Sequence, residues 1–206
     1  MELFNGDCLN ILPQLEDNSI DLFFTDLPYN QVACDFDKNV INLEEMWNQL
    51  NRVCKINCPM IFTCTTKFGI KLINSNPKNF RYDLVWLKNT SSGFLLAKKM
   101  PLRKHEMIYV FYRKLPSYNI EDNHTKKVII SKKKSTRKDS CYDIKEESVS
   151  SYTPPLPNSI LEIKRDSDKL HQTQKPVALM EWILKYYSKE NDIVLDICMG
   201  SGSMGV

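Results

Sequence analysis

The four residues Asp26-Leu27-Pro28-Tyr29 place a carboxylate, a rigid proline and an aromatic ring directly after the apolar run Ile20–Thr25. The carboxylate of Asp26 and the carbonyl of Leu27 accept hydrogen bonds, and the ring of Tyr29 offers a stacking face. These groups are suited to holding a planar base that carries an amino group. The alternative is a strand end followed by a polar turn, and four residues alone do not decide between the two.

A second stretch with chemical potential lies at Asp192–Ser203. Its apolar part indicates a buried strand, and Gly200-Ser201-Gly202 then forms a loop without bulky side chains. Such a loop lets a ligand approach the backbone closely, and a helix usually follows it. A lone Gly-x-Gly is weak evidence, so its weight depends on its pairing with the Asp26 motif.

The elements that position these stretches are predicted from the apolar pattern, and buried parallel strands read as continuous apolar runs. The crevice outside the carboxyl ends of such strands is where open α/β sheets bind ligands. Further strands are expected over Leu3–Cys8, Pro59–Thr65, Tyr82–Lys88, His105–Tyr112 and Asn158–Lys164. Helices are expected over Leu9–Leu15, from the N-cap Asn42, around Phe68–Ile73 and from Pro176 to Ser188.

The composition fits one α/β domain of 206 residues with 42% apolar residues. The net charge of +3 is too small to prove a nucleic-acid partner. Seven cysteines without a C-x-x-C pair predict reduced thiols and no metal site, and Cys54 and Cys58 have no histidine pair near them. No apolar run approaches the ~20 residues of a membrane span, so we expect no membrane association and a cytoplasmic protein, in the host cell if the source is a phage or virus.

Motif order and several further segments then point to one family. The acidic motif precedes the glycine loop, and five other stretches fit the same pattern: Asn5–Leu9, Ala33–Asp37, Gly93–Lys99, Pro101–Glu106 and His171–Met180. Together they resemble the β class of DNA amino-methyltransferases, phage-type members included, over nearly the whole chain outside 120–158. The resemblance implies a Rossmann-like α/β sheet in permuted order that binds S-adenosyl-L-methionine.

The resemblance also implies roles for individual residues. Asp7 would face the adenine of the cofactor, and Thr173 and Lys175 would lie near its methionine carboxylate. The catalytic residues would be Asp26, Leu27, Pro28 and Tyr29. The cofactor-binding residues would be Asp7, Cys8, Thr173, Lys175, Pro176, Asp196, Met199, Gly200, Ser201, Gly202 and Ser203.

The implied substrate is an amino group of a base in double-stranded DNA, extruded from the helix. Asp26 and the carbonyl of Leu27 would accept its two N–H groups and expose the nitrogen lone pair. An acid at the first motif position favours adenine N6, while cytosine N4 remains an alternative. Leu27 replaces the more usual proline of the family, but its carbonyl is retained.

Two basic segments are candidates for DNA contact. We predict phosphate contacts for Lys98, Lys99, Arg103, Lys132, Lys133 and Lys134. Solvated surface loops would explain these side chains as well. The predicted organisation is a catalytic part at 1–114, an inserted target-recognition segment at 115–158 and a cofactor-binding part at 159–206.

The last residue is Val206, four positions after Gly202. In the family a helix follows the glycine loop, and then a strand whose acid holds the ribose, about 20 residues on. We therefore expect an incomplete C-terminal edge with an exposed strand that favours self-association, as in a homodimer. Two other functions stay open: an inactive DNA-binding remnant, and a methyltransferase of the same sheet acting on protein glutamine or RNA, against which the motif order argues.

Overall fold

The computed structural model describes residues 1–30, 41–120, 129–133, 148–152, 156–167 and 174–205. They form two compact units, one made of residues 1–118 and 159–206 and the other of residues 119–158. The larger unit holds every described residue of the Asp26 motif and of the glycine loop. The two units are described separately.

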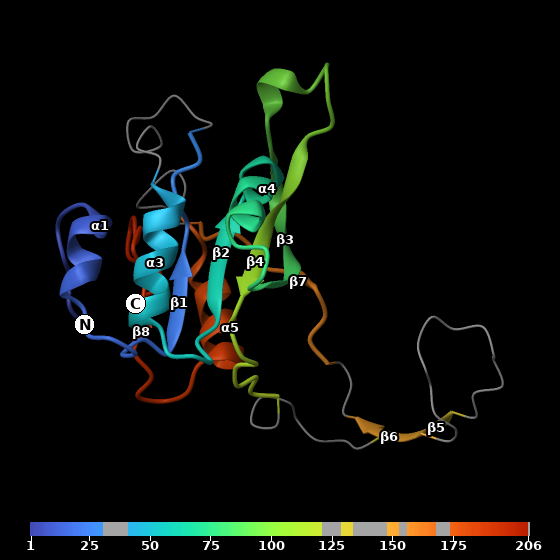
Figure 1. The fold of residues 1–206 in the computed structure, drawn as a ribbon. Coiled ribbons are helices and arrows are strands. Elements are labelled where there is room, and N and C mark those ends of the chain that lie inside the picture. The colour runs from blue at the N-terminus through green and yellow to red at the C-terminus, as the bar shows by residue number, and fades with distance from the viewer. Residues whose placement is uncertain (31–40, 121–128, 134–147, 153–155, 168–173, 206) are drawn as a thin grey trace. The chain divides into compact units, whose positions relative to one another are not determined.

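A six-stranded sheet forms the centre of the larger unit (Figure 1). Its strands follow the order β7 (Ile160–Glu162), β3 (Phe80–Ser92), β4 (Arg103–Phe111), β2 (Met60–Cys64), β1 (Leu22–Thr25) and β8 (Val194–Leu195). Strand β1 pairs in parallel with β2 and β8, and β3 pairs in parallel with β7. Only β4 runs antiparallel to its neighbours, β2 and β3.

The reversed direction of β4 brings its first residues to the edge where β1, β2 and β3 have their carboxyl ends. The pairing of β2 with β4 stops at Cys64 opposite Met107. Strands β3 and β4 continue to pair beyond that point, as far as Ser92 opposite Arg103. They form a hairpin that projects past the sheet at the top of Figure 1, with the short 3-10 helix η2 (Phe94–Leu96) at its tip.

Helices cover both faces of the sheet. Helices α3 (Leu43–Val53) and α4 (Thr66–Ser75) lie over one face, and α5 (Val177–Tyr187) lies over the other (Figure 1). The first core contains Phe23, Phe62, Phe111, Trp47 and Leu50. The second contains Leu22, Ile61, Trp86, Val110, Leu179 and Ile183. Because β1 and β2 are buried on both faces, their sequences are continuously apolar rather than alternating, and the predicted α/β class is confirmed.

Most predicted elements are confirmed, including the helix that begins after Asn42. The side chain of Asn42 accepts hydrogen bonds from the backbone N–H groups of Glu44 and Glu45, as an N-cap does. The strand expected over Leu3–Cys8 is wrong. Residues 1–6 have no regular structure, and Leu3 and Phe4 are exposed. Asp7 instead caps the short helix α1 (Cys8–Ile11), which continues into the 3-10 helix η1 (Leu12–Gln14).

The smaller unit contains an antiparallel strand pair, β5 (Ile129–Lys133) with β6 (Ser148–Tyr152). It overlaps the segment 115–158 predicted from the sequence as an insertion. Lys132 and Lys133 lie in β5, opposite Val149 and Ser148. Lys134 lies outside the described residues, as do Thr173 and the loop at 31–40.

Candidate functional site

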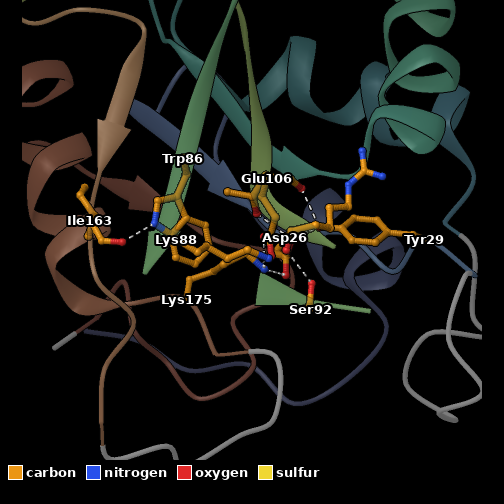
Figure 2. A network of polar contacts seen from close by, with 10 residues as sticks. Asp26, Tyr29, Trp86, Lys88, Ser92, Glu106, Ile163 and Lys175 are labelled. Carbon is orange, nitrogen blue, oxygen red and sulfur yellow. Dashed lines mark hydrogen bonds and ion pairs between the residues drawn. The ribbon is translucent and has the colours of Figure 1, made fainter. Parts of the chain in front are cut away.

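Asp26 follows β1 directly and receives three hydrogen-bond donors (Figure 2). The hydroxyl of Thr63, in the neighbouring strand β2, donates to Oδ1 over 2.7 Å. The hydroxyl of Tyr29 donates to the same oxygen. The ammonium group of Lys175, just before α5, donates to Oδ2 and forms an ion pair with it.

A carboxylate offers about four acceptor positions, two on each oxygen. Both positions on Oδ1 of Asp26 are used by Thr63 and Tyr29, and Lys175 uses one on Oδ2. Among the described residues no other donor bonds to Asp26. With donors from the described residues counted, one acceptor position remains on Oδ2, at the carboxyl edge of the sheet.

Lys175 joins Asp26 to a second ion pair. Its Nζ lies 3.6 Å from Oε2 of Glu106, whose Oε1 accepts a hydrogen bond from Nζ of Lys88 over 3.0 Å. Glu106 lies in β4 opposite Trp86 of β3, and Lys88 follows two residues later. Lys88 and Lys175 are both buried, so the four alternating charges compensate one another inside the protein.

The electrostatics of this network favour the charged forms. Burial alone would raise the pKa of Glu106, but Lys175 and Lys88 hold that pKa below its ordinary value. Burial alone would lower the pKa of Lys175, but Asp26 and Glu106 raise it above its ordinary value. The opposite directions of the two shifts are those of a strongly coupled ion pair.

Tyr29 contributes more than the stacking face expected from the sequence. Its ring lies against Phe68 of α4, with 5.3 Å between the ring centroids. Its hydroxyl donates to Asp26 and lies 2.9 Å from the backbone carbonyl of Thr63. Burial, followed by the charge of Asp26, raises the pKa of Tyr29 well above its ordinary value, so the phenol stays protonated as a donor. The structure thus makes the hydroxyl an orienting group for Asp26.

The glycine loop begins after β8, in the strand position next to β1. Asp196 is half-buried and accepts a hydrogen bond from the backbone N–H of Cys198 over 3.0 Å, and burial raises its pKa to about 6. Gly200 and Gly202 have φ angles of +54° and +78°, which favour glycine. No atom lies within 4 Å of where a Cβ of Gly200 would stand, so the loop backbone is open to a ligand.

The two ends of the chain meet at this loop. The neighbouring side chain of Cys198 lowers the pKa of the Cys8 thiol, and neither cysteine forms a disulfide. Asp7 is exposed, and its carboxylate accepts from the N–H of Leu9 over 2.9 Å. The charge of Asp26 also acts on Asp196. The structure therefore brings the Asp26 motif, residues 7–8 and the start of the glycine loop together.

Within the larger unit, the predicted DNA-binding residues Lys98, Lys99 and Arg103 lie outside this cluster. Lys98 and Lys99 are exposed at the tip of the β3–β4 hairpin, and Arg103 donates from its Nη2 to Thr66 Oγ1 over 3.2 Å. Sequence reasoning missed Thr63, Lys88 and Glu106 as site residues. A signal was present for two of them, because a single acid in the apolar run 105–112 and a lysine closing the run 82–88 are unusual in buried strands.

Two structural findings concern classes of function. Within the part of the chain that the structure describes, no helix has the length and apolarity needed to cross a membrane. The same residues contain no group of three or more His, Cys, Asp or Glu side chains placed to hold a metal ion.

Comparison with known proteins connects this geometry to a family. Residues 20–206 match the family model described as DNA methylase, which covers N6 and N4 methyltransferases. The type II methyltransferase M.BglII of Bacillus subtilis is 24% identical over 98% of this chain and 60% of its own length. The DNA adenine methyltransferase YhdJ of Escherichia coli (strain K12) is 25% identical, over 98% of this chain and 72% of its own length.

Solved structures share the fold at low sequence identity. The PvuII DNA methyltransferase (cytosine-N4-specific) superposes with a TM-score of 0.71 at 14% identity, covering 98% of this chain and 75% of that one. The M1.HpyAVI–SAM complex gives a TM-score of 0.61 at 21% identity, covering 98% and 84%. The chain thus spans only three fifths to about four fifths of the length of these proteins.

Proposed function

Because the chain belongs to the DNA methylase family, we propose that it transfers a methyl group from S-adenosyl-L-methionine to the N6 amino group of adenine in double-stranded DNA. The family resemblance seen in the sequence is confirmed by the match over residues 20–206. The family also contains cytosine-N4 enzymes, so the choice of adenine is part of the proposal.

The observation that carries the proposal is the single acceptor position left on Oδ2 of Asp26. An amino group has two N–H donors, and this position takes one of them while the backbone carbonyl of Leu27 takes the other. The amino nitrogen of adenine is a weak nucleophile because its lone pair is delocalised into the ring. Holding both N–H groups in hydrogen bonds favours a pyramidal nitrogen whose lone pair is free to react.

The network around Asp26 supports this role by fixing the carboxylate before the substrate arrives. Thr63 and Tyr29 hold Oδ1, and Lys175 holds one side of Oδ2, so the remaining lone pair has a defined direction. Preorganised acceptors and donors of this kind lower the barrier without moving during the reaction. Glu106 and Lys88 in turn fix Lys175.

The residues after β8 fit the cofactor. The open backbone around Gly200 leaves space that a side chain would fill, and Asp196 supplies a half-buried carboxylate beside it. Other parts of the cofactor would be held by Met199 and Gly202 of the loop and by Asp7 and Cys8 at the start of α1. When bound there, S-adenosyl-L-methionine supplies an electrophilic methyl group on its sulfonium.

An adenine assignment is favoured over cytosine N4 by the acid at the first position of the motif. Asp26 accepts but, as a carboxylate, does not donate. The same geometry would also accept the N4 amine of cytosine. YhdJ, one of the relatives above, is named as an adenine methyltransferase, and the PvuII enzyme is named as cytosine-specific.

The test is incubation of the protein with labelled S-adenosyl-L-methionine and unmethylated plasmid DNA, followed by digestion and chromatography of the nucleosides. We expect label in N6-methyladenine, and none with the Asp26→Ala variant. Label in N4-methylcytosine would replace the adenine assignment. Equal background incorporation by the wild type and Asp26→Ala would contradict catalysis and favour a DNA-binding remnant.

A further inference from the structure

The tip of the β3–β4 hairpin exposes an apolar cluster that the proposed reaction does not use. Phe94, Leu95 and Leu96 follow Gly93 in a 3-10 turn and are 72%, 101% and 46% exposed. Met100, after the turn, is 56% exposed. Large contiguous apolar surfaces are rare on soluble proteins unless they bind something. We call residues 93–102 the hairpin tip.

The surroundings of the hairpin tip are strongly basic. The chain has no Asp or Glu between Asp83 and Glu106. The cations near the tip are Lys98, Lys99, Arg103 and Lys104, and all four are exposed. Apolar side chains framed by unopposed positive charge match a partner that combines a polyanionic surface with an apolar interior. Duplex DNA has this combination, with phosphates outside and stacked bases inside.

The hairpin tip stands on the strands that carry the charge network of the site. Lys88 in β3 and Glu106 in β4 lie at the base of the hairpin, and Gly93 follows Lys88 by five residues. At a rise of about 3.3 Å per residue, the tip begins at most roughly 16 Å beyond Lys88. Figure 1 shows the hairpin leaving the sheet at the edge where β1 ends, and Asp26 is the residue that follows β1.

We infer that the hairpin tip is a DNA wedge: Phe94 and Leu95 enter the base stack beside the extruded target base while Lys98 and Lys99 contact the phosphates. This inference rests on the proposed DNA substrate. Extrusion of a base leaves a gap in the stack, and apolar side chains inserted between base steps replace part of the lost stacking. The full exposure of Leu95 is expected of such a residue before DNA binds.

The experiment measures binding by fluorescence anisotropy on two short mixed-sequence duplexes, one fully paired and one with a single abasic gap. The variants are Phe94→Ala/Leu95→Ala, Lys98→Gln/Lys99→Gln and the control Ile56→Ala. Ile56 is also an exposed apolar residue, 45% accessible. It precedes the first residue of β2, whereas the hairpin leaves the sheet at the edge where β2 ends. Thermal melting of each variant verifies that the fold is retained.

We expect the apolar double variant to lose affinity for both duplexes, by about ten- to hundredfold on the gapped one, where the wedge inserts without first opening the stack. Its dependence on salt should stay unchanged, because apolar contacts release no counterions. The lysine double variant should instead flatten the log–log salt slope by roughly 0.9 for each lost phosphate contact. Ile56→Ala should behave as the wild type.

Three outcomes would overturn the inference. One is an apolar variant that binds both duplexes as tightly as Ile56→Ala does. Another is a loss that appears only as a change in salt slope. The third is a wild type that self-associates in sedimentation through Phe94 and Leu95 without any effect on DNA, which would make the tip an interface between copies. If the variants change DNA binding as expected but the protein transfers no methyl group, the proposed reaction is contradicted and the wedge inference is supported.

Discussion

Replacement of Lys175 by methionine removes the cation that links Asp26 to Glu106 while keeping most of the side-chain volume. Lys175 is only 8% exposed, so its loss leaves two carboxylates facing each other beside an apolar chain. Breaking a buried ion pair from one side typically costs 3–5 kcal/mol. The side chains of Asp26 and Glu106 keep 22% and 21% of their surface in water. We therefore expect the low end of that range, about 3 kcal/mol.

Urea unfolding followed by fluorescence measures this loss. With an m-value of about 2 kcal/mol/M, the midpoint should fall by roughly 1.5 M in Lys175→Met. The double variant Lys175→Met/Asp26→Asn should recover part of the loss, because it removes the carboxylate whose ion-pair partner is gone, whereas Glu106 keeps its ion pair with Lys88. Lys189→Met, at an exposed lysine beyond α5, is the matched control and should change the free energy of unfolding by about 0.5 kcal/mol or less.

The pH dependence has a defined sign. In the wild type the pKa of Glu106 is lowered, so its stabilising contribution is present at neutral pH and is lost only as the pH falls through that lowered pKa. In Lys175→Met one of the two charges that lower the pKa of Glu106 is gone, so this pKa is higher than in the wild type, and the variant loses less stability than the wild type as the pH falls. The deficit should be smaller at pH 5 than at pH 7. A loss below about 1 kcal/mol would refute the coupled network, and so would a deficit that is relieved neither by lower pH nor by Asp26→Asn.

Three further predictions concern single side chains of the site. Asp26→Ala should reduce the single-turnover rate of methyl transfer more than tenfold, about 1.4 kcal/mol, while DNA affinity measured by anisotropy stays nearly unchanged. A variant that keeps more than about a tenth of the wild-type rate would exclude Asp26 as the amine acceptor. Tyr29→Phe keeps the ring but removes a hydrogen-bond donor to Oδ1 of Asp26, so methyl transfer should slow by about tenfold. A wild-type rate in this variant would show that the hydroxyl does not contribute to transfer. Cofactor affinity measured by calorimetry should fall as the pH drops below about 6, where Asp196 takes up a proton. Asp196→Asn should bind weakly at every pH, whereas a pH-independent wild type would place Asp196 outside the cofactor site.

Local signals in the sequence were enough to predict most of the elements and the position of Asp26 at the end of a buried strand. The apolar run before Asp26 forms β1, and Asn42 caps α3, because strand burial and helix capping depend on neighbouring residues. The strand expected over Leu3–Cys8 failed for the same reason. Three apolar residues gave too little pattern, and the capping side chain of Asp7 stabilises a helix start instead.

The partners of Asp26 were beyond the reach of local patterns. Lys175 is 149 positions away from it, and the local sequence placed this lysine near a cofactor carboxylate because it precedes a helix. Only the sheet order reveals the pairing, since reversal of β4 brings Glu106 to the carboxyl edge. The assignments to the cofactor and to DNA remain predictions, and those at Thr173 and Lys134 lie outside the described residues.

In the proposed reaction, the single acceptor position on Asp26 would also determine when methylation stops. An unmodified amine brings two N–H groups to two acceptors, Oδ2 of Asp26 and the carbonyl of Leu27. A methylated amine brings only one, so one acceptor loses its partner and the new methyl group has to be accommodated beside it. The product is held less firmly than the substrate, which favours its return to the duplex. A second methylation would start from an amine that the site orients through one contact instead of two, so the enzyme should add a single methyl group and release the base.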